Sequence, residues 1–186
     1  MGREPKFAYG WKADAAMPRT GLLHCRVESP MATAAKAIGE GAVLAIPLGD
    51  GRWTLAQVYL PGVVFFLLVF DDLSDALPDH PVITGPPVLG SWTNDAEVYR
   101  GNWRLLTHLP VAAGIFAEPE YSVLRGGESF VESFDGKTFR PSVAGDESLK
   151  NRKSRSPLLV EDATRAFFGL KDWAPHYEDM LLIPRV

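Results

Sequence analysis

The sequence contains one cysteine in 186 residues, and other features that carry chemistry are also missing. Cys25 alone excludes an internal disulfide and a zinc site built on several thiolates. Neither a G-x-S-x-G nucleophile motif nor a glycine-rich phosphate loop occurs. The histidines are scattered and none has the helical i, i+4 spacing of a metal site: His24, His80, His108 and His176. We therefore expect no metal, no cofactor and no enzymatic activity.

Long apolar segments are also lacking. The longest apolar run covers residues 60–70, much shorter than the ~20 residues that a membrane-spanning helix needs. No charged start followed by an apolar stretch and a small-residue cleavage site indicates a secretory signal. The sequence therefore predicts a cytoplasmic protein without membrane contact. A content of 46% hydrophobic and 23% charged residues is typical of a globular domain.

Positive charge is absent from one part of the chain. No Lys or Arg lies between Trp53 and Tyr99, and residues 71–87 contain four Asp and four Pro, a composition typical of a loop. One interpretation is a solvated acidic loop. The other is a docking surface for a basic partner, since clustered charge speeds encounter. A part of the chain that carries only negative charge disfavours nucleic acid as a partner. The carboxylates of this part are Asp71, Asp72, Asp75, Asp79, Asp95 and Glu97.

Two further features have alternative interpretations. The basic run Lys150–Arg155 could touch phosphate, but it has no interleaved aromatic residue and the chain has a net charge of -4, so a solvated loop is favoured. Trp92 and Trp103 flank a polar segment, and each is either a core residue or, if exposed, an anchor for a partner. We therefore include Trp92 among the candidate binding residues.

Apolar patterning predicts several strands. Residues 43–48 and 53–60 alternate around Gly49-Asp50-Gly51, which indicates a hairpin. Residues 63–70 are apolar on both faces, as in a strand covered on each side, and residues 102–108 also have strand character. A second hairpin is predicted over 129–143 around Asp135-Gly136, with Pro141 restricting its strand to an edge.

One firm helix is predicted near the C-terminal end. Ser156 is a suitable N-cap, Pro157 fits the first turn, and Gly169 ends the helix. A second short helix follows Pro175. The sequence therefore predicts an α+β fold, with a twisted antiparallel sheet, either open or barrel-like, and a C-terminal helical segment packed on it. The helical face expected to pack on the sheet comprises Leu159, Ala163, Ala166, Phe167 and Leu170.

Two parts of the chain are distinguished. Residues 1–37 lack sustained periodicity and are expected to form a loosely ordered extension, in which Met1, Met17 and Met31 are alternative start positions. Residues 38–186 are expected to form a single domain.

A family resemblance begins at the first hairpin. Residues 41–58 follow the pattern G-x-x-x-A-I-P-L-x-D-G-x-W/Y-x-x-x-Q-V, and later segments include Val69-Phe70-Asp71 and Gly169-Leu170-Lys171-Asp172-Trp173. Over about residues 38–182 the chain resembles the immunity protein 26 family of bacterial polymorphic toxin systems. The resemblance implies a non-enzymatic antidote that binds a cognate toxin. The candidate toxin-binding residues are Asp71, Asp72, Asp75, Asp79 and Trp92.

An enzyme is the alternative. The first hairpin is also similar, more weakly, to the opening strand and turn of small-barrel toxin endoribonucleases, and Arg52 or Arg104 would then contact phosphate. The lack of basic residues over 53–99 disfavours this alternative, because such an enzyme needs a basic groove.

Overall fold

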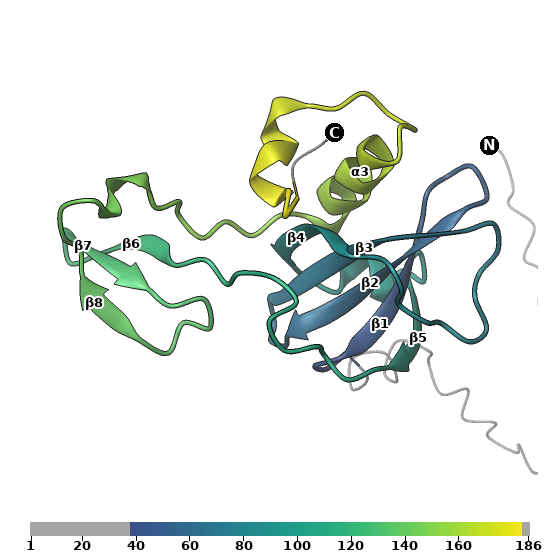
Figure 1. Ribbon diagram of the computed structural model, residues 1–186, viewed down its shortest axis with the longest axis horizontal. Coiled ribbons are helices and arrows are strands. Elements are labelled where there is room, and N and C mark those ends of the chain that lie inside the picture. The colour runs from purple at the N-terminus through teal and green to yellow at the C-terminus, as the bar shows by residue number, and fades with distance from the viewer. Residues whose placement is uncertain (1–37, 184–186) are drawn as a thin grey trace, which may run out of the picture.

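A five-stranded antiparallel sheet forms the centre of the protein (Figure 1). The computed structural model describes residues 38–183, so the extension expected over residues 1–37 lies outside the described residues. The strand order is β4-β3-β2-β1-β5. The described chain is α+β, and its strands close no barrel, because β4 and β5 lie at opposite edges of the sheet. The strand bounds are β1 (Ala42–Pro47), β2 (Trp53–Leu60), β3 (Phe65–Ser74), β4 (Pro87–Thr93) and β5 (Arg104–His108).

The first hairpin is confirmed. β1 and β2 pair in antiparallel register from Val43↔Gln57 to Pro47↔Trp53. The turn between them contains Gly49 at φ 87° and Gly51 at φ 94°. Glycine is favoured at both positions because it has no Cβ to clash at positive φ.

β3 is an interior strand that is buried on both faces, as predicted. Its odd-numbered apolar residues pack toward one core cluster and its even-numbered ones toward another, which follows from the two-residue period of a strand. The predicted bounds are wrong at both ends. Val63 is 93% exposed, and Asp71 to Ser74 belong to β3 rather than to a loop. The pairing of Leu73 and Ser74 with β2 extends the strand beyond its apolar part.

A short helix, α2 (Ala96–Tyr99), precedes β5. The longer helix α3 (Pro157–Phe167) begins and ends as predicted. The Ser156 hydroxyl accepts a hydrogen bond from the Leu159 amide at 3.2 Å, and Gly169 follows the helix at φ 73°. The residues buried against the sheet include Val160, Ala163, Thr164 and Ala166.

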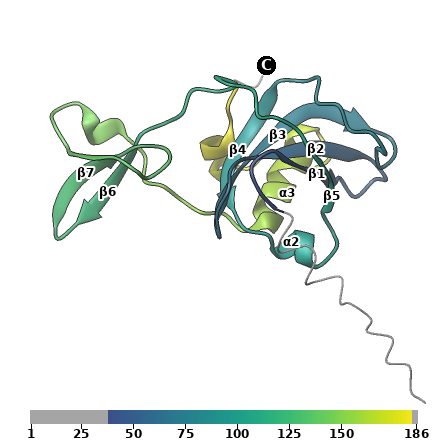
Figure 2. The ribbon, with the colours of Figure 1, turned by 90° about the horizontal axis from the view of Figure 1, so that it is seen from below.

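The predicted packing face of α3 is confirmed except at Leu170. Ala163 and Ala166 are buried in the core, and the half-buried Leu159 and Phe167 pack against it. Leu170 is 37% exposed. Figure 2 shows α3 against one face of the five-stranded sheet. The second predicted helix is present as the 3-10 helix η2 (Pro175–Met180).

A second, three-stranded sheet projects from the first (Figure 1). It contains β6 (Tyr121–Arg125), β7 (Glu128–Glu132) and β8 (Phe139–Pro141) in that order, followed by the short 3-10 helix η1 (Asp146–Ser148). The predicted hairpin is confirmed, with β8 at the edge as Pro141 requires. Its connection is longer than two residues, because residues 133–138 form a loop closed by a 3.0 Å backbone hydrogen bond from Ser133 to Thr138.

Two features join the sheets. Phe134, in the β7–β8 loop, packs against Phe66 of β3 with ring centroids 4.8 Å apart. Residues 150–155, which we call the basic segment, pair with both sheets through isolated bridges at Ser122↔Asn151 and Trp92↔Ser154. The basic segment is therefore a structural link between β6 and β4.

Candidate functional sites

The segment 71–86 comprises the last four residues of β3 and the connection to β4, and we call it the acidic loop. It is fixed by one of its own carboxylates. Asp72 accepts hydrogen bonds from the Thr84 amide at 3.0 Å, the Thr84 hydroxyl at 2.6 Å and the Gly85 amide at 3.0 Å. At Gly85 an added Cβ would lie 2.3 Å from the Asp71 carbonyl oxygen, so the two ends of the loop approach closely. Asp72 therefore holds the loop closed and is not free for a partner.

The other three carboxylates of this loop face solvent. Asp71, Asp75 and Asp79 are exposed, and their side chains form no hydrogen bond or ion pair among residues 38–183. Exposed apolar side chains lie between them in the sequence: Leu73 at 47%, Leu77 at 41% and Val82 at 67% exposure. The charge of Asp75 acts electrostatically on Arg52. The loop thus presents exposed negative charge together with apolar area.

Residues 53–99, which contain no Lys or Arg, have two further carboxylates outside the acidic loop. Glu97 is 1% exposed and accepts hydrogen bonds from the side chains of Arg100 and Asn102. Asp95 is half-buried at the start of α2. Four of the six carboxylates therefore lie in the acidic loop, and these two lie outside it.

Arg52 and Arg104 are the residues that an endoribonuclease would use. Arg52 lies in the β1–β2 turn, where its Nε and Nη2 each lie 2.7 Å from an oxygen of Asp50. Because Arg52 donates to it, the pKa of Asp50 is held below its ordinary value. Arg104 begins β5 and is exposed. The positive charge of Arg52 is therefore already matched by a neighbouring carboxylate.

Trp92 is a core residue and not an exposed anchor. Trp92 is only 7% exposed, and its indole N–H donates to the Tyr121 hydroxyl at 3.0 Å. The Arg152 guanidinium lies 4.6 Å from the centroid of the Trp92 ring. Trp103 is also buried and donates to Glu161 at 3.1 Å. The condition for an anchor role, exposure, is met by neither indole.

The basic segment is not a simple solvated loop. Arg152 points inward, where it donates to the carbonyls of Ser133 at 3.1 Å and Phe134 at 2.7 Å and pairs with Glu132 at 3.3 Å. The other three cations gather around Asp179, at 3.0 Å from Lys150, 3.3 Å from Lys153 and 3.1 Å from Arg155. Hydrogen bonds from Lys150 and Lys153 hold the pKa of Asp179 below its ordinary value.

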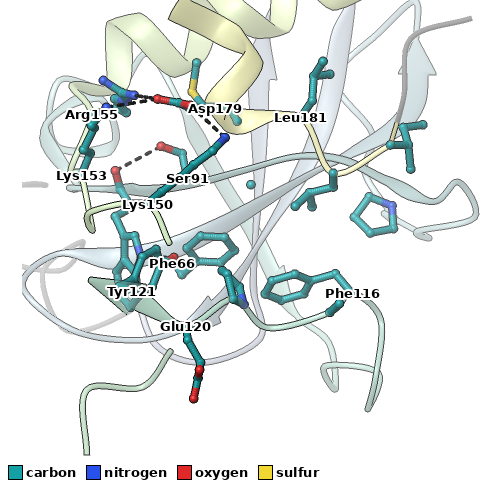
Figure 3. A pocket seen from close by; sticks show the side chains of 18 of the residues that line it. Phe66, Ser91, Phe116, Glu120, Tyr121, Lys150, Lys153, Arg155, Asp179 and Leu181 are labelled. Carbon is teal, nitrogen blue, oxygen red and sulfur yellow. Dashed lines mark hydrogen bonds and ion pairs between the residues drawn. The ribbon is translucent and has the colours of Figure 1, made fainter. Parts of the chain in front are cut away.

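These three cations border a cavity of about 630 Å³ (Figure 3). Its walls come from β4, from the connection that leads into β6, from the basic segment and from residues 179–183. The sequence does not predict this cavity. Its walls are segments up to about a hundred residues apart in the chain, and no local sequence pattern indicates that they come together. Trp92 lines it as well, so one candidate residue lies beside a different site from the acidic loop.

Within residues 38–183, no three or more His, Cys, Asp and Glu side chains are placed to hold a metal ion. None of the helices in this range is long and apolar enough to cross a membrane.

Comparisons of the chain with family models, with curated proteins and with solved structures gave no match in any of the three.

Proposed function

We propose that this chain is an immunity protein of the immunity protein 26 type, which binds and neutralises a cognate bacterial toxin without catalysis of its own. The observation that carries the proposal is the acidic loop. Three exposed carboxylates, Asp71, Asp75 and Asp79, alternate with three exposed apolar side chains on a backbone that Asp72 fixes.

The two kinds of side chain support different parts of binding. Clustered carboxylates attract a basic partner and raise the rate of encounter. Apolar side chains supply the area that is removed from water when the complex forms. Because Asp72 anchors the loop in the free protein, less conformational entropy is lost on binding than for an unanchored loop. A toxin that cleaves nucleic acid has a basic substrate groove, whose charge is opposite to that of the acidic loop. We propose that the two proteins meet in the cytoplasm.

Coexpression with the product of the adjacent reading frame tests the proposal. We expect that product to arrest growth, this chain to restore growth, and the two proteins to be recovered as a complex. Absence of both rescue and complex would refute the immunity function, and RNA cleavage by the purified chain would then support the endoribonuclease.

Charge reversal tests the acidic loop itself. We expect the triple variant Asp71→Lys, Asp75→Lys, Asp79→Lys to slow association about tenfold at low salt, and to change Tm by no more than about 2 °C because the three side chains are exposed and form no hydrogen bond. Stopped-flow association kinetics measure the first effect and circular dichroism the second.

A matched control separates docking from net charge. The variant Glu40→Lys, Glu128→Lys, Asp172→Lys changes the net charge equally at three exposed carboxylates outside the acidic loop. We expect it to slow association much less. Equal slowing by the two triple variants would mean that the loop has no specific docking role.

A further inference from the structure

The cavity beside β4 combines an apolar wall with a basic rim (Figure 3). Its volume of about 630 Å³ lies in the ~300–1,000 Å³ range of small-molecule sites, which are mostly apolar with a few converging polar groups. The acidic loop contributes only Pro86 to its lining. The cavity is therefore a second candidate site, distinct from the proposed docking surface.

The apolar wall is built from both sheets and the C-terminal part of the described chain. Phe66 and Phe116 stack with ring centroids 5.3 Å apart, and Leu181 and Leu182 close the wall beside β4. Gly90 lies directly under this wall, where an added Cβ would lie 2.8 Å from Phe66 Cζ and 3.1 Å from Leu182 Cδ2 and would displace these side chains. The apolar part of a small molecule can therefore lie along aromatic rings that are already held in place by packing.

The rim has more positive than negative charge. Lys150, Lys153 and Arg155 share the single carboxylate of Asp179. Glu120, on the opposite side of the cavity, is already paired with Arg140 at 2.9 Å. Two positive charges at this rim are therefore not matched by an acidic partner of their own among the described residues.

We propose that this cavity binds an amphipathic organic anion, that is, a small molecule with one carboxylate or phosphate group on an apolar body. The anionic group lies between Lys150, Lys153 and Arg155, and the apolar body lies along Phe66, Phe116 and Leu181. Burial of the body contributes the hydrophobic part of the affinity, and charge-assisted hydrogen bonds fix the orientation.

Asp179 competes with such a ligand for the same cations. Its two carboxylate oxygens occupy the position that the ligand's anionic group would take, at 3.0–3.3 Å from the three donors. Removal of the Asp179 charge should therefore strengthen ligand binding. A purely structural role of the cluster would give no such gain.

Isothermal titration calorimetry with dodecanoate and dodecyl phosphate, each below its critical micelle concentration, tests the proposal. We expect the full chain to bind at least one of them in a one-to-one complex and to bind dodecanol and dodecyltrimethylammonium much more weakly. The more tightly bound anion identifies the headgroup. The indole N–H signal of Trp92, which lines the cavity, should shift on binding in NMR spectra.

Three variants locate the site. Lys150→Glu with Lys153→Glu should weaken binding by about tenfold or more, because hydrogen bonds to charged groups are lost. Asp179→Asn should strengthen it severalfold. Lys137→Glu with Lys171→Glu has the same change in net charge at two lysines outside the cavity lining and should leave the affinity nearly unchanged. Failure of both anions to bind the wild-type chain, or equal affinities for all variants, would overturn the proposal.

This experiment does not depend on the toxin. Loss of growth rescue with intact anion binding would refute the proposed immunity function alone, whereas rescue without anion binding would refute only the role of the cavity.

Discussion

Single polar side chains connect segments that are distant in the sequence. The Tyr59 hydroxyl of β2 donates to Glu118 at 2.5 Å, and so attaches the connection between β5 and β6 to the central sheet. The Glu118 hydrogen bond, and then desolvation, raise the pKa of Tyr59 to about 12. Both favour the protonated phenol, since the phenolate would face a carboxylate in a partly buried position.

This raised pKa predicts how stability depends on pH. A folded-state pKa above the unfolded value of ~10 stabilises the fold below pH ~10, and this contribution is lost as the pH rises through about 12. We expect the difference in 295 nm absorbance between the wild type and Tyr59→Phe to titrate near pH 12. Glu118→Gln should bring this titration back toward pH 10. A wild-type midpoint near pH 10 would contradict the contact.

The roles of individual residues were only partly predictable. The continuous apolar run correctly predicted the burial of Phe65 to Phe70 on both faces of β3. The sequence could not distinguish Asp72 from Asp71, because the difference is the partner at Thr84, which comes near Asp72 only when the loop closes. For the same reason, no local sequence pattern predicts that the side chain of Arg152 points inward.

At the scale of elements, α3 depends on its N-cap. The Ser156 hydroxyl satisfies the free amide of Leu159, one of the donors that the first helical turn leaves without a partner. Ser156→Ala should therefore lower the free energy of unfolding by about 1 kcal/mol, and Ser156→Asp should retain most of it. Urea unfolding followed by circular dichroism measures both. Equal stabilities of the wild type and Ser156→Ala would show that the cap does not contribute.

Element bounds were predicted best where capping and turn residues are strong. The start of α3 at Pro157 and the first hairpin turn at Gly49 and Gly51 are of this kind. β4 was not predicted, because Pro87 and Gly90 give it the local character of a turn. Its pairing with β3 overrides that preference, and an added Cβ at Gly90 would displace the ring of Phe66.

At the scale of the whole molecule, Phe134 joins the two sheets. It is 3% exposed and its ring contacts those of Phe66, Trp92 and Tyr121. Phe134→Ala should cost about 3–5 kcal/mol of the free energy of unfolding, because a buried ring is replaced by a cavity. In the Phe134→Ala variant we also expect the backbone amides of β6 to β8 to exchange hydrogen faster than those of β1 to β3.

A control for this variant lies in the same sheet. Phe139 of β8 is 37% exposed, with the Arg125 guanidinium 3.5 Å from its ring centroid. Phe139→Ala should cost much less than Phe134→Ala. Similar costs for both variants would mean that Phe134 does not connect the sheets.

The arrangement of the molecule was the least predictable level. An antiparallel sheet and a C-terminal helix packed on it follow from apolar patterning, and both are present. The pairing of β1 with β5, the projection of the second sheet and the cavity all depend on contacts between segments far apart in the chain. Composition correctly indicated an unusual charge distribution, but the clustering around Asp179 required the fold.

The position of the basic segment has a consequence for the integrity of the protein. It covers the outer edge of β4 at Trp92 and an edge of β6 at Ser122. Uncovered strand edges template the pairing of further chains. Lys150 and Lys153 are both exposed, so a trypsin-like protease can cut the chain inside the segment that covers these two edges and loosen their cover. Such nicking would favour edge-to-edge pairing of β4 and β6 with other chains.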